Sequence, residues 1–208
     1  MKKFEVKDKV LIKFGDDYRK LKGDFDRLEK KFEQKVYNSL LDENKRVQIM
    51  IKKALIKAPV EEVFKAFVKS AINDLNPNID LNEIEEGCFG ITSKKTNNQT
   101  FRIETYEVEE EFSIKYYSKT NSYSRCVKFK PSKNNTKIKY TDTNIGMETV
   151  FGLKQNYLKG IYQKTRNISF QIQILNLKLE IEKLDEKTIN KYNEKLQKLN
   201  LKLQKYQR

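Results

Sequence analysis

The chain has 208 residues, of which 38% are hydrophobic and 35% charged. This length and polarity predict one globular core with solvated segments attached, rather than two full domains. No run of about 18 apolar residues is present to span a membrane, and no continuous apolar stretch near Met1 forms a signal peptide. We therefore expect a cytoplasmic protein without a membrane span.

Histidine and cysteine, which many enzymes and metal sites use, are scarce in this sequence. Histidine is absent, which removes the usual general base near neutral pH and the imidazole metal ligand. Cys88 and Cys126 are too few for a disulfide framework or a four-thiolate metal site. The seven glycines are scattered and form no phosphate-binding loop. The sequence thus disfavours catalysis and indicates no metal and no cofactor.

The net charge of +14 leaves two interpretations open. It favours non-specific contact with nucleic acid or another polyanion. However, 36 of the 43 basic residues are lysine and only seven are arginine, the usage that an AT-rich coding bias produces. Arginine makes the bidentate contacts typical of specific recognition, so the charge by itself indicates solubility and non-specific binding.

Two terminal segments, 1–46 and 183–208, carry heptad patterns that predict helical, coiled-coil-like arms. We expect the arms to pack on each other as an antiparallel pair within one chain. The alternative is a helix from a partner, which makes the protein a homo-oligomer or an adaptor. The apolar positions of the first arm are Phe14, Tyr18, Leu21, Phe25, Leu28 and Phe32, and those of the second are Ile189, Tyr192, Leu196, Leu199, Leu203 and Tyr206.

The central segment, 47–182, has the order strand, helix, five strands, long helix. Residues 47–57 predict the first strand, and Pro59 with Glu61 and Glu62 marks a helix start. The long helix, from about Val150 to Glu182, has two apolar rows and so contacts two neighbours. Alternating apolar residues predict the five intervening strands, which cover 88–95, 100–108, 112–119, 123–130 and 137–142.

This central segment resembles the helix-grip superfamily, the START-like or SRPBCC group. The phrase from Ile56 to Phe64, IKAPVEEVF, is similar to the recurring opening of that group. The group includes START-type lipid-transfer domains, plant pathogenesis-related ligand binders and polyketide cyclases. Within it, the chain is most similar to an uncharacterised bacterial family of intracellular helix-grip proteins. The resemblance implies an α+β fold, an antiparallel sheet of about six strands wrapped round a long C-terminal helix.

The resemblance also implies a hydrophobic cavity between the sheet and the long helix. The alternative, that the same residues only fill a solid core, stays open. An enzymatic role would rest on Asp142 or Tyr140, and no set of polar residues is evident around them. The residues expected to line the cavity are Phe101, Ile103, Tyr116, Val127, Phe129, Ile138, Tyr140, Tyr157 and Ile168.

From these patterns we expect a non-enzymatic binding module that holds an apolar small molecule or lipid. The alternative is an interaction or adaptor protein whose basic helical arms dock on RNA, the ribosome or a protein partner. The segment 183–208 has eight basic residues against three acidic ones, which gives this alternative its main support.

Overall fold

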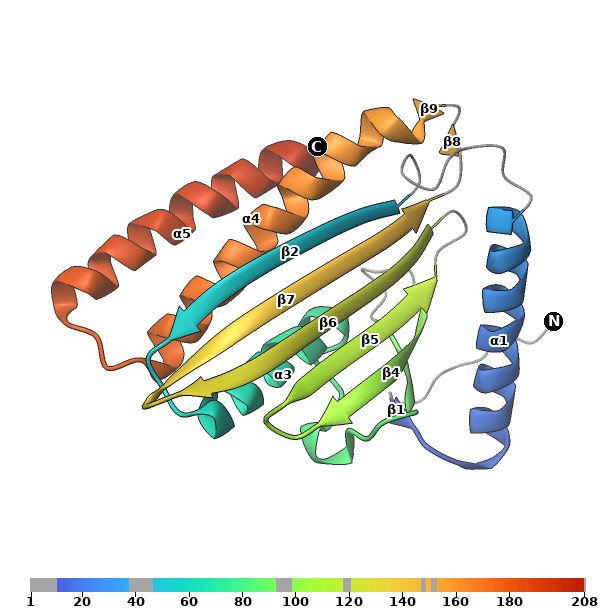
Figure 1. Cartoon of the computed structure of the whole chain (residues 1–208), viewed down its shortest axis with the longest axis horizontal. Helices are drawn as coiled ribbons and strands as arrows, with labels where there is room; N and C mark the ends of the chain where they lie inside the picture. The colour runs from blue at the N-terminus through green and yellow to red at the C-terminus, as the bar shows by residue number, and fades with distance from the viewer. Residues whose placement is uncertain are drawn as a thin grey trace.

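The computed structural model describes residues 11–37, 47–92, 99–117, 121–146, 149–150 and 153–207, and only the backbone of 35–37, 149–150, 153–159 and 207. Over these residues the fold is α+β, with a seven-stranded antiparallel sheet and a long helix near the C-terminus (Figure 1). The sheet order is β1-β3-β4-β5-β6-β7-β2. Its strands are β1 (Leu11–Ile12), β2 (Val47–Ile56), β3 (Phe89–Ile91), β4 (Thr100–Glu107), β5 (Glu111–Tyr117), β6 (Asn121–Ser132) and β7 (Asn135–Gly146).

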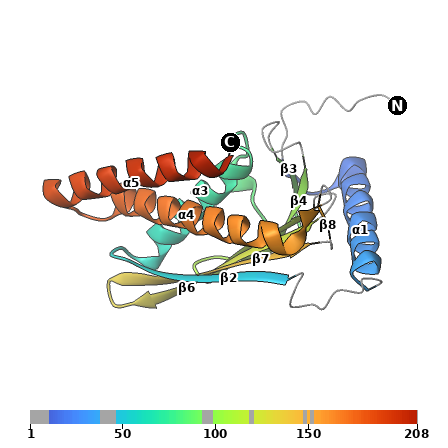
Figure 2. The ribbon, with the colours of Figure 1, turned by 90° about the horizontal axis from the view of Figure 1, so that it is seen from above.

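Helices lie on both faces of this sheet. One face, called here the inner face, is covered by α3 and α4, and α5 packs on the far side of α4 (Figure 2). The opposite, outer face carries α1 near one end of the strands. The helices are α1 (Gly15–Tyr37), α3 (Val60–Leu75), α4 (Gln155–Ile181) and α5 (Glu186–Gln207), with a short 3-10 helix η1 (Leu81–Glu83) after α3.

The main core forms where α3 and α4 meet the inner face. Alternate residues of β4 to β7 point into it, and α3 contributes the apolar face that follows Pro59, including Phe64 and Phe67. Gly90 lies directly opposite Phe101 in the β3–β4 register, and a side chain on Gly90 would overlap the Phe101 ring. Phe101 therefore owes its full burial to packing across a glycine on the neighbouring strand.

The described helices of the two arms, α1 and α5, do not pair with each other, so that prediction is wrong. In α1, Phe25 and Phe32 pack on Phe89 and Tyr117 of the outer face. The Phe25 ring meets Phe89 edge-on at 5.4 Å and Tyr117 at 5.1 Å between centroids. A heptad pattern requires that an apolar stripe be covered but does not specify the cover, and here aromatic residues of the sheet provide it for α1.

The other arm, α5, runs antiparallel along α4 (Figures 1 and 2). Asp185 precedes it and accepts a hydrogen bond from the Thr188 backbone N–H at 2.7 Å, which starts the helix. The prediction that α4 contacts two neighbours is confirmed, because its row with Phe170 and Ile174 faces the sheet and the opposite row faces α5. The apolar positions of α5 after Ile189 are half-buried, apart from exposed Leu201.

Two boundaries differ from the sequence-based expectation. The sheet has seven strands rather than about six, because Leu11–Ile12 pairs with β3 at the far edge. The long helix begins at Gln155 and not at Val150, since Val150 belongs to a two-stranded ladder of β8 (Thr149–Val150) and β9 (Leu153–Lys154). The apolar spacing runs through both segments, and periodicity alone does not place the start of a helix.

Candidate ligand-binding cavity

A charged cluster lies on the inner face, between the β6–β7 hairpin and α4. Arg125 of β6 and Asp142 of β7 are direct partners in the antiparallel register. Arg166 reaches them from α4, one helical turn before Phe170 of the core. Three charged residues therefore sit at positions that each element otherwise fills with core residues.

Asp142 is the centre of the cluster. Its side chain is 1% exposed and lies 2.9 Å from Arg166 Nε and 3.3 Å from Arg125 Nε. The hydroxyl of Tyr162 donates to Asp142 Oδ1 at 2.6 Å, and that of Tyr140 donates to Oδ2 at 3.1 Å. The carboxylate thus joins β6, β7 and α4 through two ion pairs and two phenolic hydrogen bonds.

The electrostatics of the cluster keep Asp142 ionised. Burial alone raises the pKa of this carboxyl, but the charges of Arg166 and Arg125 and the two tyrosine hydrogen bonds outweigh burial and hold the pKa below its ordinary value. Burial and the neighbouring carboxylate both raise the pKa of Tyr162. Burial likewise raises the pKa of Tyr140, although the two arginines oppose it. Both phenols therefore stay protonated near neutral pH.

The two guanidinium groups have more hydrogen-bond donors than the cluster has acceptors. Arg125 Nη2 donates to the Tyr116 hydroxyl and Arg166 Nη2 to the Tyr140 hydroxyl, each at 2.7 Å. The Arg125 Nε lies at ion-pair distance from Asp142, yet it makes no hydrogen bond within the described part of the chain. This excess of donors beside a carboxylate that already accepts several bonds leaves the cluster able to bind a further acceptor.

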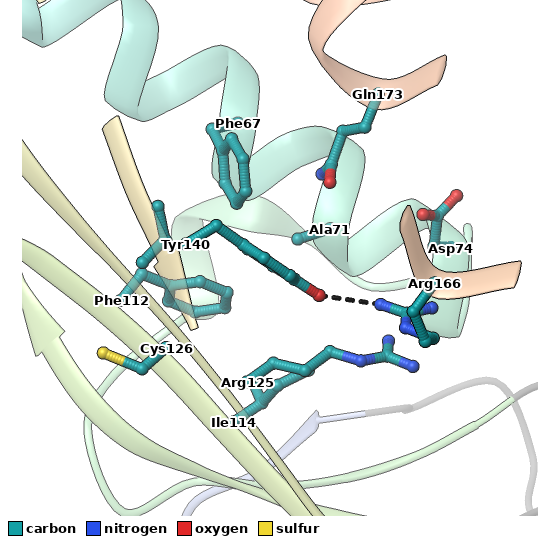
Figure 3. Close-up of a pocket in the computed structure, with 11 residues that line it drawn as sticks. Phe67, Ala71, Asp74, Phe112, Ile114, Arg125, Cys126, Tyr140, Arg166 and Gln173 are labelled. Atoms are coloured by element: carbon teal, nitrogen blue, oxygen red, sulfur yellow. Dashed lines mark hydrogen bonds between the residues drawn. The ribbon is translucent and has the colours of Figure 1, made fainter. Parts of the chain in front are cut away.

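A cavity of about 30 Å³ adjoins the cluster, and Figure 3 shows its walls. This volume holds about two water molecules. One wall is apolar, and the other presents the two arginines, with Asp74 of α3 and Gln173 of α4 also on the lining. The lining residues are Phe67, Ala71, Asp74, Phe112, Ile114, Arg125, Cys126, Val127, Tyr140, Arg166 and Gln173.

The structure places the residues predicted to line a cavity in several different positions. Val127 and Tyr140 do line it. Tyr116 is buried beside it and holds Arg125 by a hydrogen bond and by its ring, 5.3 Å from the guanidinium carbon. Ile168 is buried but stands about 160° round α4 from Phe170, on the side away from the core. Phe101, Ile103, Phe129 and Ile138 belong to the packed core and not to the lining.

Tyr157 belongs to α4, but the structure describes only its backbone and not its side chain. The expectation of a wholly apolar lining is wrong, because Arg125, Arg166 and Asp74 were not foreseen. A signal for two of them was present. In its strand, Arg125 alternates with Tyr123 and Val127 and therefore points to the same side of the sheet as they do. In α4, Arg166 lies four residues before Phe170 and so occupies the same apolar row of the helix. Each arginine is therefore at a position that faces the core.

Other reactive groups give little support for chemistry. Burial, together with Glu111, raises the pKa of the Cys126 thiol to about 12, and burial raises that of Cys88, so both stay protonated thiols. Across the described residues, no group of three His, Cys, Asp or Glu side chains is placed to hold a metal ion. None of the helices in the same part of the chain has the length and apolar character needed to cross a membrane.

Comparison with known proteins gives structural likeness alone. No family model matches this sequence, and no curated protein matches it either. The crystal structure of CalU16 from Micromonospora echinospora is similar with 13% identity, over 74% of this chain and 88% of that one, at a TM-score of 0.45.

Two further solved structures are similar to the same extent. The Aha1 dimer from Colwellia psychrerythraea shares 13% identity over 65% of this chain and 97% of that one, with a TM-score of 0.48. Protein MLL2253 from Mesorhizobium loti shares 12% identity over 66% and 99% of the two chains, with a TM-score of 0.47. At these identities the function of the cavity has to be inferred from its own contacts.

Proposed function

We propose that this chain is a non-catalytic binding module of the helix-grip kind. In this proposal its cavity takes the anionic or hydrogen-bond-accepting head of a small ligand. The observation that carries it is that Arg125 and Arg166 meet at one wall of a cavity, where the Nε of Arg125 makes no hydrogen bond with a described residue. The apolar wall opposite, with Phe67 and Phe112, suits a short hydrocarbon part. The ligand is therefore smaller and more polar at one end than the lipid that the sequence led us to expect.

The size of the cavity sets how such a ligand enters. With room for about two waters, the partly open cavity accepts a carboxylate-sized head in their place. The remainder of the ligand passes between α3 and α4, where Ala71 and Gln173 form part of the lining. Gln173 Nε2 donates to the Ser70 hydroxyl at 3.4 Å, a long bond that opens at low cost. We expect these side chains to move when the ligand binds.

The ionisable groups of the Asp142 cluster support binding more than catalysis, while burial raises the pKa of Asp74 elsewhere on the lining. A general acid or base works best with a pKa near the working pH. Here the pKa of Asp142 is lowered and those of Tyr140 and Tyr162 are raised, so each moves away from neutrality. Asp142 is also fully engaged with four partners. These groups are placed to hold a fixed charge pattern and not to transfer protons.

Native mass spectrometry of the purified protein tests the proposal, with the denatured mass as reference. Ala71→Leu fills the cavity, and Asn73→Leu is the matched control, because Asn73 is exposed on the same helix. We expect a released mass, or uptake of added hexanoate, in the wild type and in Asn73→Leu but not in Ala71→Leu. A bare mass for the wild type that stays bare with hexanoate would overturn the proposal.

A second candidate function, docking on a phosphate backbone, is favoured by one feature of α5. Its lysines fall on a single exposed stripe beside the row that packs on α4, at spacings of three and four residues. Binding to single-stranded RNA should then weaken steeply with salt, and the paired substitution Lys195→Gln and Lys198→Gln should reduce the salt slope. If neither higher salt nor the paired substitution weakens RNA binding, this candidate function is excluded. The stripe consists of Lys187, Lys191, Lys195, Lys198, Lys202 and Lys205.

A further inference from the structure

The outer face of the sheet carries an array of lysines at the end where β6 turns into β7. The register places Lys53, Lys139 and Lys128 side by side across β2, β7 and β6. In the adjacent row Lys137 lies opposite Lys130. All five side chains are exposed. Like charges directly opposite each other on a sheet are destabilising, so this arrangement costs the folded protein stability.

Only a small part of this charge is balanced in the described structure. Lys128 pairs with Glu111 of β5 at 2.5 Å, and this acid is the neighbour of Lys128 in the register. For the other four lysines of the array, no ion pair with a described residue is found. The array therefore presents a net positive surface of about four charges.

Exposed aliphatic side chains lie on the same face. Leu55 stands opposite Lys137 within the array, and Ile51 and Ile49 continue the outward-facing row along β2. They are 44%, 53% and 54% exposed, respectively. The strand is the edge of the sheet, and the described helices α3, α4 and α5 lie on the inner side, while α1 covers the far end (Figures 1 and 2). Large aliphatic residues and lysines thus share one open surface.

We propose that this surface, made of the five lysines with Ile49, Ile51 and Leu55, docks on a lipid bilayer with anionic headgroups. Lysines near such a surface are attracted to the headgroups, and exposed aliphatic side chains gain by entering the boundary between headgroups and acyl chains. This inference is independent of the cavity, which opens on the inner side of the sheet.

Other occupants fit the surface less well. A second copy of the chain would bring the same lysines against each other and add to the repulsion. A nucleic acid would bind the lysines, but the surface has no exposed aromatic ring or arginine to contact the bases, and its aliphatic residues would have no role. An anionic bilayer is the partner that uses both kinds of side chain.

Co-sedimentation of the full-length protein with vesicles tests the proposal. The probes are vesicles of phosphatidylcholine alone and of phosphatidylcholine mixed with phosphatidylglycerol. We expect partitioning onto the mixed vesicles only. The paired substitution Lys137→Gln and Lys139→Gln should reduce it roughly 25-fold, at about fivefold for each charge. Its matched control, Lys164→Gln on α4 with Lys183→Gln just after that helix, removes the same charge from exposed residues outside both lysine surfaces and should leave most of the binding.

The aliphatic part of the surface is tested separately. Ile49→Thr with Ile51→Thr keeps β-branched residues in the strand, and Val108→Thr changes a residue that is 61% exposed on the β4–β5 hairpin. We expect the first to weaken binding to the mixed vesicles by at least about fivefold and the second to leave it unchanged. Circular dichroism checks that each variant is folded.

Three results would overturn the inference. One is the absence of binding to the mixed vesicles. Another is equal loss from both lysine pairs, which would mean that net charge alone acts. The third is that single-stranded RNA binds through Lys137 and Lys139 whereas vesicles do not, which would assign the surface to nucleic acid.

Discussion

Removal of the charge of Asp142 is the perturbation that the structure predicts most sharply. Asp142→Asn keeps the size of the side chain but leaves Arg125 and Arg166 buried without a counter-charge. Breaking a buried ion pair from one side costs about 3–5 kcal/mol. Asparagine still accepts a hydrogen bond from Tyr162 or Tyr140, which places the expected loss toward the lower part of that range.

Urea denaturation followed by circular dichroism measures this loss, and calorimetry gives the change in Tm. A loss of 3–5 kcal/mol corresponds to a decrease of roughly 6–20 °C for a chain of this size. The control is Asp74→Asn, which removes the same charge from an exposed residue on the cavity lining and should cost less than about 1 kcal/mol. If Asp142→Asn also costs less than about 1 kcal/mol, the cluster does not clamp α4 to the sheet as argued.

Three more predictions follow from the same contacts. Because the pKa of folded Asp142 is below its ordinary value of 3.8, its stabilisation is complete above that pH and is lost as pH falls through the folded pKa. Urea midpoints of the wild type should therefore decrease more than those of Asp142→Asn between about pH 5 and pH 2, and parallel curves would contradict this. Phe25→Ala should cost about 3–5 kcal/mol by leaving a hole under α1, whereas Leu28→Ala, at a 44% exposed position, should cost little; equal losses would show that α1 does not rest on Phe25. Lys139→Glu should stabilise the fold by about 0.2–1 kcal/mol because it places an acid between Lys53 and Lys128, and a lower urea midpoint would be inconsistent with the register.

The strands and helices of the central segment followed from local patterns. Alternation in β6 and β7 and the two rows of α4 are short-range signals, and the order of the elements limited the topology. The extra strand β1 was not predictable in the same way, because two residues, Leu11 and Ile12, carry no periodicity. The elements on which the two arms pack were not predictable either. An apolar stripe such as the one on α1 packs equally well on another helix or on aromatic residues of a sheet.

The candidate site was only partly predictable for a different reason. Inward-facing positions were expected to be apolar, so Arg125 and Arg166 were not predicted, although both share the periodicity of core residues. Asp142 pairs with Arg125 across β6 and β7, and this pairing can be identified only when the register of the two strands is known. Whether a cavity exists depends on how side chains from β6, α3 and α4 interlock, and no pattern within one element encodes that volume.

The central claim, that the two buried arginines hold the head of a ligand, is tested most directly by NMR of the arginine side chains. Seven arginines are few enough for each Nε–H signal to be resolved and assigned by substitution. Titration with hexanoate should shift the signals of Arg125 and Arg166 in a saturable way, leave those of the other arginines in place, and have no such effect in Ala71→Leu. Signals that do not move, or that all move together, would contradict a binding site at this cluster.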